Sequence, residues 1–332
     1  MRSSHPFTAV GDRTLVARLG APRTAETTRL AVVGDPHVAT RTHGTNRVFH
    51  RTTPCLSACV DDLNDRTVDL VVFPGDLTKD GEPWNYAQVE TILGTLEHPF
   101  VAVPGNHDLE KRGQEHTYPT AATFGEQFAG GPFPRAHRVG GLELLLLNTA
   151  GDSNGAYDDS HRGRVCTAQR EWLETRLDSV CGSPESPTPV IVCHHNPIPL
   201  VGDPLRRTTR WRTFTLRERD RFQQLLERFP VELVLSGHHH LPALATEGSV
   251  SQLIAPALAS YPQAYCLVEV GPDGTSIWLI SVADETDRHE SYELAANGPA
   301  FYRTLLGMTE TTLDSLPLVT ETSPLANDLV VD

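Results

Sequence analysis

The segment VELVLSGHHH, residues 231–240, joins a short apolar run to a cluster of histidines. β-Branched apolar residues followed by Ser-Gly are typical of a buried strand that ends in a loop. Four other apolar runs end in polar clusters in the same way, namely GDPH at 34–37, GDLT at 75–78, PGNHD at 104–108 and CHHNP at 193–197. If the five strands share a sheet, the clusters emerge at its carboxyl edge, where open α/β folds bind ligands.

The clusters supply carboxylate oxygen, amide oxygen and imidazole nitrogen, which are donors that suit Mn, Fe, Co, Ni or Zn. A single Gly-Asp or Asp-Pro-His is ordinary turn chemistry, and a run of three histidines can be accidental. Five such clusters, each directly after an apolar run, instead predict a metal site built from residues that are distant in sequence.

The order and wording of the clusters resemble the calcineurin-like metallophosphoesterase superfamily, whose pattern is D-x-H, G-D, G-N-H-[DE], H and G-H-x-H. The resemblance runs from about Arg29 to about Ile280 and is closest to the class III cyclic-nucleotide phosphodiesterase branch. Three further stretches fit that branch, namely GDLTKDGEPWNY at 75–86, HRGRV at 161–165 and TAQREWLETRL at 167–177. The resemblance implies an α/β fold, a four-layer α/β/β/α sandwich of two mixed sheets.

The resemblance also implies a dinuclear metal site. Carried over by position, one metal would be held by Asp35, His37 and His240, the other by Asn106, His194 and His238, and both by Asp76. The cofactors would be two divalent or mixed-valence ions, with Mn, Fe, Zn, Co and Ni all open. A shared carboxylate reduces the repulsion between the ions, and the neutral Asn106 leaves the site electropositive, so that it attracts phosphate.

Two assignments within the histidine clusters depend on local spacing. In CHHNP either His194 or His195 could be the ligand, and the family spacing before the proline favours His194. His238 and His240 are two residues apart, so on an extended chain they would point the same way, while His239 would point to the other face.

The expected chemistry follows from two metals. Ions about 3.5–4 Å apart lower the pKa of a bridging water and clamp the attacking and leaving oxygens of an in-line displacement at phosphorus. His107 would assist the leaving group, because imidazole titrates near neutrality. Asp108 would either orient that imidazole or cap the next helix. Substrate contacts are expected from Asn106, His107 and Arg47, the last from the polar loop Arg41–Arg51.

The segment Leu200–Arg221 carries seven arginines directly after the CHHNP cluster. Guanidinium groups bind phosphate in a bidentate manner, so this segment could form a lip over the substrate. A solvated loop and helix start is the favoured interpretation in an acidic chain.

Composition limits the partners. The 332 residues, 39% of them hydrophobic, can bury a substantial core. A net charge of −14 disfavours nucleic acid as a partner. The six cysteines show no framework spacing, which favours buried free thiols in a reducing compartment. We expect a cytoplasmic protein without a membrane partner, because no apolar run resembles a signal peptide or a membrane span. The sequence leaves a homo-oligomer open.

Three segments are expected along the chain: residues 1–28 as a lead-in or edge hairpin, 29–296 as the catalytic domain, and 297–332 as a loosely attached extension. Helices are expected at 54–64, 84–96, 167–180 and 217–229. After SGHHH, the runs 250–254, 264–270 and 276–282 would complete the second sheet.

Taken together, the sequence predicts a hydrolase of phosphodiesters, with 3′,5′-cyclic nucleotides as the expected substrate. Alternatives with the same site are a phosphomonoesterase and a glycerophosphodiesterase. A protein phosphatase is disfavoured, because GDLTKDG and PGNHD stand where that branch has GDxVDRG and RGNHE. A non-catalytic scaffold of this fold is disfavoured as well, because such proteins usually lose ligands.

Overall fold

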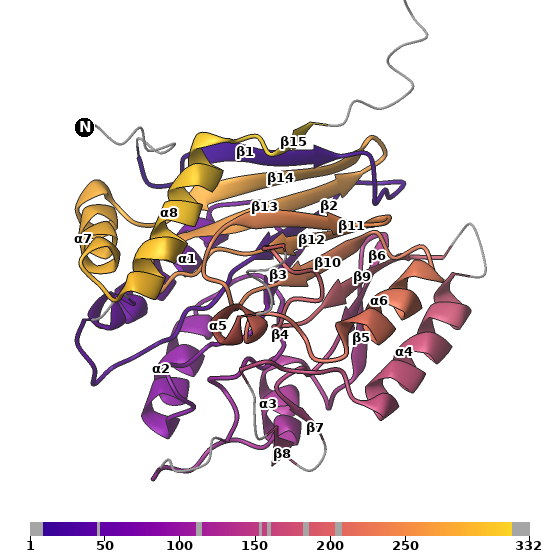
Figure 1. Cartoon of the computed structure of the whole chain (residues 1–332), viewed down its shortest axis with the longest axis horizontal. Coiled ribbons are helices and arrows are strands. Elements are labelled where there is room, and N and C mark those ends of the chain that lie inside the picture. Colours follow the sequence, from indigo (N-terminus) through magenta and orange to yellow (C-terminus); the bar gives the residue numbers. More distant parts are fainter. Residues whose placement is uncertain are drawn as a thin grey trace, which may run out of the picture.

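The computed structural model describes residues 9–44, 47–110, 115–152, 155–157, 161–181, 186–202 and 208–320, without the side chains of 209 and 210. Two mixed sheets stack face to face and helices cover their outer faces (Figure 1). This is the four-layer α/β/β/α sandwich that the resemblance implied.

The first sheet has seven strands. Their spatial order is β15 (Val319–Thr320), β1 (Arg13–Leu19), β14 (Gly274–Ser281), β13 (Ala264–Gly271), β2 (Thr28–Val32), β3 (Leu70–Phe73) and β4 (Phe100–Ala102). Strands β2, β3 and β4 are parallel, whereas β13 runs antiparallel to both β2 and β14. The outer face of this first sheet is covered by α1 (Thr52–Asn64), α2 (Pro83–Leu93) and α3 (Ala121–Phe128).

The second sheet has six strands. Their order is β11 (Ala243–Glu247), β12 (Val250–Ile254), β10 (Leu233–Ser236), β9 (Thr188–Val192), β6 (Leu142–Leu146) and β5 (Arg135–Val139). Helices α4 (Thr167–Val180) and α6 (Arg219–Glu227) pack on its outer face. The remaining elements are η1 (Phe49–Arg51), β7 (Gly151–Asp152), β8 (Gly155–Ala156), α5 (Thr209–Arg212), α7 (Glu285–Ala296) and α8 (Ala300–Asp314).

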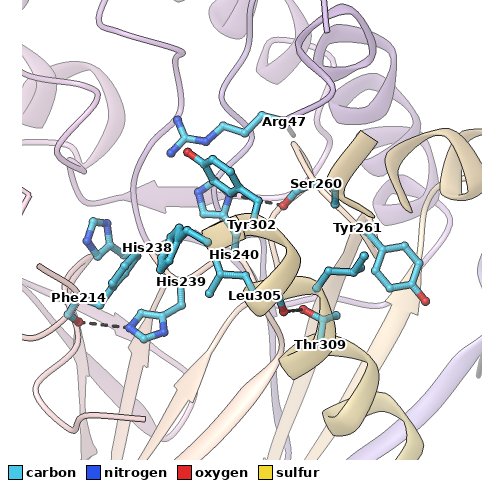
Figure 2. A pocket seen from close by; sticks show the side chains of 13 residues that line it. Arg47, Phe214, His238, His239, His240, Ser260, Tyr261, Tyr302, Leu305 and Thr309 are labelled. Carbon is cyan, nitrogen blue, oxygen red and sulfur yellow. Dashed lines mark hydrogen bonds between the residues drawn. The ribbon is translucent and has the colours of Figure 1, made fainter. Parts of the chain in front are cut away.

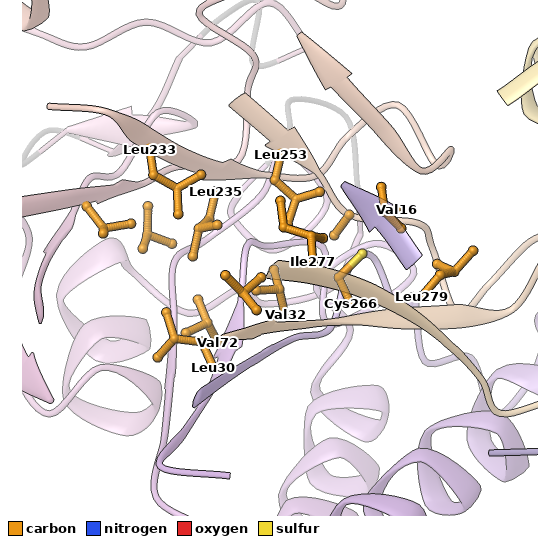
Figure 3. Packing of buried hydrophobic residues seen from close by; sticks show 14 of the residues in the cluster. Val16, Leu30, Val32, Val72, Leu233, Leu235, Leu253, Cys266, Ile277 and Leu279 are labelled. Atoms are coloured by element: carbon orange, nitrogen blue, oxygen red, sulfur yellow. The ribbon is translucent and has the colours of Figure 1, made fainter. Parts of the chain in front are cut away.

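Strands that are buried on both faces explain why the apolar runs are continuous. In β2, Leu30 and Val32 point into the core between the sheets, while Ala31 points to the helices. Figure 3 shows Leu30 and Val32 facing Leu233 and Leu235 of the other sheet. Each strand is therefore fixed from two sides, which holds its carboxyl end in place.

The five strands that precede the polar clusters do not share a sheet. Strands β2, β3 and β4 belong to the seven-stranded sheet, and β9 and β10 to the six-stranded one. The three runs after SGHHH are divided as well: β12 joins the second sheet, but β13 and β14 complete the first. Apolar runs identify strands, but they carry no information about which sheet each strand joins.

Both predicted flanking segments are part of the first sheet. β1 lies between β15 and β14, so it is neither an edge strand nor a lead-in. Residues Leu306 and Leu313 of α8 are buried in the core between the sheets, and β15 pairs with β1. The expected loose attachment is therefore wrong for residues 300–320, and residues 1–8 and 321–332 lie outside the described part.

The four expected helices are confirmed as α1, α2, α4 and α6, with ends that differ by a few residues. All six cysteines are free thiols, and four of them are buried. Among the described residues, no helix has both the length and the apolar character needed to cross a membrane.

Candidate metal centre

The polar clusters meet where strands from both sheets end. The turns after β2, β3 and β4 carry GDPH, GDLT and PGNHD, and the turns after β9 and β10 carry CHHNP and SGHHH. The seven predicted ligands are almost fully buried, with His240 the most accessible. Two sheets thus bring together residues that are up to 205 positions apart, from Asp35 to His240.

The backbone at these turns is unusual. Among the described residues, seven that are not glycine have a positive φ, and five of those are predicted ligands. They are Asp35 (44°), His37 (44°), Asp76 (54°), His238 (71°) and His240 (62°). Residues other than glycine rarely adopt this left-handed backbone region, because it costs about 1–3 kcal/mol per residue. Such backbone strain is concentrated at functional sites. His238 and His240 are therefore not on an extended chain, and the period-2 argument for their direction was wrong.

Two glycines of the motifs are required by close approach. A Cβ at position 105 would lie 2.1 Å from Asp76 Oδ1, and one at position 237 would lie 2.5 Å from Asp35 Oδ2. Any side chain at either position would displace a carboxylate of the site. This explains why glycine precedes the donors in PGNHD and SGHHH.

The first set of donors contains Asp35, His37, Asp76 and His240, whose ligand atoms all lie within 4.8 Å of one another. His37 Nε2 is 3.0 Å from His240 Nε2 and 3.4 Å from Asp76 Oδ2. His240 Nε2 is 3.5 Å from Asp35 Oδ1. These four side chains face a common point.

The second set converges on His194. Its Nε2 lies 3.2 Å from Asn106 Oδ1, 3.1 Å from His238 Nδ1 and 3.3 Å from Asp76 Oδ2. Asp76 Oδ2 is therefore close to a histidine of each set. The structure brings all seven predicted ligands together in the two groups that the resemblance implied.

Hydrogen bonds around the second set indicate that it suits a cation. His194 Nδ1 donates to Pro74 O at 2.8 Å, which leaves Nε2 with a lone pair. His238 Nε2 faces two carbonyl oxygens, those of His161 (3.1 Å) and Thr213 (3.3 Å), so its Nδ1 carries the lone pair. Two bare nitrogens and two oxygens that only accept then face one another. A metal ion, or a proton in its absence, stabilises such an arrangement.

His195 lies in the same neighbourhood but makes different contacts. Its ligand atom is within 4.8 Å of those of His194 and His238. However, its Nδ1 lies 2.8 Å from the hydroxyl of Thr149, whereas His194 contacts Asp76 directly. These contacts favour His194 as the ligand. His239 Nε2 lies 3.3 Å from Phe214 O, away from both donor sets.

Electrostatics couple the two sets through Asp76. Burial disfavours its charged form, but His194, His107 and His37 together hold the pKa of Asp76 well below its usual range. Burial likewise opposes a charge on His194, yet Asp76 and Asp35 raise the pKa of His194 to about 9. Burial lowers the pKa of His37 and His238. In the absence of a bound metal, these shifts favour an ionised Asp76 next to a protonated His194.

His107 stands beside the donor sets. Its backbone N–H donates to Asp76 Oδ1 at 2.8 Å. Its Nδ1 lies 2.6 Å from Lys79 O and 2.8 Å from Asp80 Oδ1, and its Nε2 lies 3.3 Å from Arg47 Nη1. Arg47, predicted as a substrate contact, is thereby placed at the edge of the site.

Asp108 does not have either of the expected contacts. Its carboxylate accepts hydrogen bonds from the backbone N–H groups of Leu77, Thr78 and Gly105, so it fastens the Asp76 turn to the Asn106 turn. Asp80 is the carboxylate that touches the His107 imidazole. Burial, with a further contribution from Asp76, raises the pKa of Asp108 to about 7. The expectation that Asp108 orients His107 or caps a helix is corrected accordingly.

Sequence reasoning missed His161 and Asp80. His161 Nδ1 is 3.2 Å from Asn106 Nδ2, and its carbonyl contacts His238. The contact between His161 Nδ1 and Asn106 Nδ2 orients the amide so that Asn106 Oδ1 faces the other metal-ligand atoms. Both residues lie in stretches that supported the resemblance, HRGRV and GDLTKDG, which was the available signal.

The arginine-rich segment is only partly described. Arg219 pairs with Glu247 and donates to Pro197 O, which ties α6 to the sheet. Arg212 and Arg221 are exposed. The side chains of Arg206, Arg207 and Arg210 lie outside the described part.

Comparison with known proteins shows which family the chain resembles. Residues 28–242 match the family model described as calcineurin-like phosphoesterase. A Synechococcus protein named "Probable cyclic nucleotide phosphodiesterase" is 29% identical over 259 residues, which cover 76% of this chain and 88% of that protein. The glycerophosphodiester phosphodiesterase of Enterobacter lignolyticus is 28% identical over 180 residues, covering 52% and 56%.

A solved structure supports the fold. The dimetal phosphatase from Danio rerio aligns with a TM-score of 0.61 and 14% identity, over 78% of this chain and 98% of that one. At this identity the likeness concerns the fold alone. The family match, in contrast, spans all five clusters and more than half of the residues. The chain therefore belongs to the calcineurin-like phosphoesterase family and is a phosphoesterase.

Proposed function

We propose that this chain is a dinuclear metal-dependent phosphodiesterase whose substrates are 3′,5′-cyclic nucleotides. The observation that carries the proposal is the position of Asp76 Oδ2, 3.4 Å from His37 Nε2 and 3.3 Å from His194 Nε2. One carboxylate oxygen is thereby shared by two donor sets, and a shared anion reduces the repulsion between two neighbouring cations.

In this proposal each set holds one ion, with Asp35, His37, Asp76 and His240 in the first and Asp76, Asn106, His194 and His238 in the second. Held there, two such ions would supply a water nucleophile at neutral pH and would neutralise charge on the phosphoryl oxygens. Manganese, iron, cobalt, nickel and zinc all suit these donors. Asn106 adds no charge, so the loaded site attracts an anionic diester.

In this proposal His107 assists departure of the alcohol. Lys79 O and Asp80 Oδ1 both accept, so Nδ1 carries a proton and Nε2 faces outward beside Arg47. Arg47 can only donate, so Nε2 accepts from its Nη1 in this structure. Once Arg47 turns to a phosphoryl oxygen, the Asp80 carboxylate stabilises the imidazolium form, which can give its Nε2 proton to the leaving oxygen. The Arg47 guanidinium can bind a phosphoryl oxygen from the same side.

The choice of diester rests on the relatives and on charge. The relative named for cyclic nucleotides aligns with 76% of this chain, and the one named for glycerophosphodiesters with 52%. A net charge of −14 favours a small diester over nucleic acid.

The test is hydrolysis by the purified, metal-analysed protein with added Mn²⁺. The substrates are 3′,5′-cyclic AMP, glycerophosphoethanolamine and p-nitrophenyl phosphate. We expect two ions per chain and the highest kcat/KM for the cyclic nucleotide. A preference for the glycerophosphodiester or the monoester would reject the cyclic-nucleotide assignment, and one ion or none would reject the dinuclear site.

A further inference from the structure

A pocket adjoins the metal centre on the side of His240. Its polar side is formed by Arg47, Ser260 and the histidines 238–240. Its apolar and aromatic lining comes from Phe214, which packs beside the histidines, and from Phe301, Tyr302 and Leu305 of α8. Figure 2 shows Tyr302 and Leu305 of α8 facing the segment that carries His238 and His240.

The aromatic side comes mainly from the C-terminal helix α8. Leu306 and Leu313 are buried and anchor the helix in the core between the sheets, while Tyr302 remains half-buried at the pocket. α8 lies beyond residue 242, where the family match ends. Phe301, Tyr302 and Leu305, which we call the α8 wall, therefore come from a part of the chain outside the segment that identifies the family.

A series of aromatic rings in contact connects the predicted ligand His238 with the residues of α8. The Phe214 ring lies 5.2 Å from that of His238 and stacks on Phe301 at 5.4 Å with an angle of 21° between the planes. Phe301 is 5.6 Å from Tyr302. The rings of Phe214, Phe301 and Tyr302 are all partly exposed. An exposed aromatic surface next to a cationic centre suits a ligand with a planar ring joined to a phosphate.

The pocket is large enough for a planar ring system, since its empty volume, which includes space open to solvent, is about 560 Å³. With the ring beside α8, the phosphate would lie toward Arg47, His238 and His240, which line the polar part of the same pocket.

We propose that Tyr302 and the aromatic face of α8 bind the base of the substrate and thereby determine specificity. This inference rests on the proposed phosphodiesterase function and identifies the part of the ester that is recognised. Stacking on an aromatic ring accepts any nucleobase, so we expect little discrimination between cyclic AMP and cyclic GMP. A glycerol-based diester gains nothing from this wall.

The experiment compares 3′,5′-cyclic AMP with methyl ribofuranoside 3′,5′-cyclic phosphate, which keeps the sugar and the diester but lacks the base. Tyr302→Ala should raise KM for cyclic AMP by about ten- to hundred-fold, the range for loss of one base–aromatic stacking contact. KM for the base-free analogue should not change. Tyr302→Phe keeps the ring and should behave as wild type with both substrates.

Thr304→Ala, an exposed position on the same helix, serves as the matched control, and Tyr302→Leu replaces Tyr302→Ala if the latter does not fold. Metal content is measured for every variant. Equal changes in KM for both substrates, or no change for either, would overturn the base-binding inference while leaving the phosphodiesterase assignment intact.

If wild type hydrolyses neither cyclic phosphate, the proposed substrate fails instead. Base binding is then read from inhibition of bis-p-nitrophenyl phosphate hydrolysis by AMP and by ribose 5-phosphate. Tighter inhibition by AMP that Tyr302→Ala abolishes would support the inference. Equal inhibition by both compounds would overturn it.

Discussion

The candidate metal centre and the α8 wall border the same pocket but depend on the sequence in different ways. The centre is built from short motifs at five strand ends, whose strained turns hold the donors a few ångströms apart. The wall is built from ordinary core-forming residues of one helix, Phe301, Tyr302 and Leu305. Chemistry therefore depends on exact local geometry, whereas the shape of the pocket depends on how a distant helix packs.

The largest effect is expected at the residue shared by both donor sets. Asp76→Ala should abolish activity and leave fewer than two ions per chain, because it removes the carboxylate near both His37 and His194. Metal analysis and turnover measure the result. Asp61→Ala, an exposed carboxylate on α1, is the control. Near-normal turnover with full metal content would disprove the dinuclear assignment.

Variants of the adjacent histidines 194 and 195 test which residue of CHHNP is the metal ligand. His194→Ala should empty one metal position, because Nε2 of His194 faces Asp76, Asn106 and His238. His195→Ala should retain both ions, since its Nδ1 contacts Thr149. Metal content of the two variants gives the answer. The reverse pattern would move the ligand by one residue.

His107→Ala separates catalysis from metal binding. Both ions should remain, while kcat falls by about 10²–10⁴-fold for a ribose leaving group, the usual range for a general acid. The loss should be smaller for p-nitrophenolate, which hardly needs a proton. Steady-state kinetics on both substrates measure the contrast. Equal losses, or loss of metal, would remove His107 from the catalytic residues.

Leu313→Ala examines the other region. Truncating this buried residue of α8 should lower the free energy of unfolding by about 2–5 kcal/mol, because it leaves a cavity in the core between the sheets. Metal content at low temperature should not change. Urea denaturation measures the loss, with Thr311→Ala, more exposed on the same helix, as control. A loss below about 1 kcal/mol would mean that α8 is attached loosely after all.

The smallest effect concerns pH. The pKa of His194 is raised to about 9 in the metal-free protein, chiefly because Asp76 outweighs the cost of burial, so His194 holds a proton at pH 7. A metal must displace that proton, so affinity should fall about tenfold per pH unit below 9. Asp76, already ionised, should release none. Calorimetry in two buffers at pH 7.5 should show about one proton released, and no release would contradict this account.

The sequence by itself determined the donors and the strands. Each apolar run is buried on both faces, and each cluster must lie at the end of its strand. The motifs GDPH, GDLT, PGNHD, CHHNP and SGHHH therefore indicated one metal site, and the resemblance to the metallophosphoesterase pattern implied which of their residues would hold each ion. These local patterns do not show which strand, side chain or helix each segment contacts in the folded chain. They did not show that β13 and β14 join the first sheet, that Asp80 rather than Asp108 reaches His107, or that α8 closes the pocket.

Only the tertiary structure decided those points, because each depends on contacts between residues far apart in the chain. Asp108 and Asp80 are both acidic residues in turns near His107, but the Asp108 carboxylate is taken up by backbone N–H groups of two turns, whereas Asp80 Oδ1 lies 2.8 Å from His107 Nδ1. The residues of α8 that build the wall would serve equally well in any amphipathic helix. Their role follows from the burial of Leu306 and Leu313 between the two sheets, which fixes where Tyr302 points.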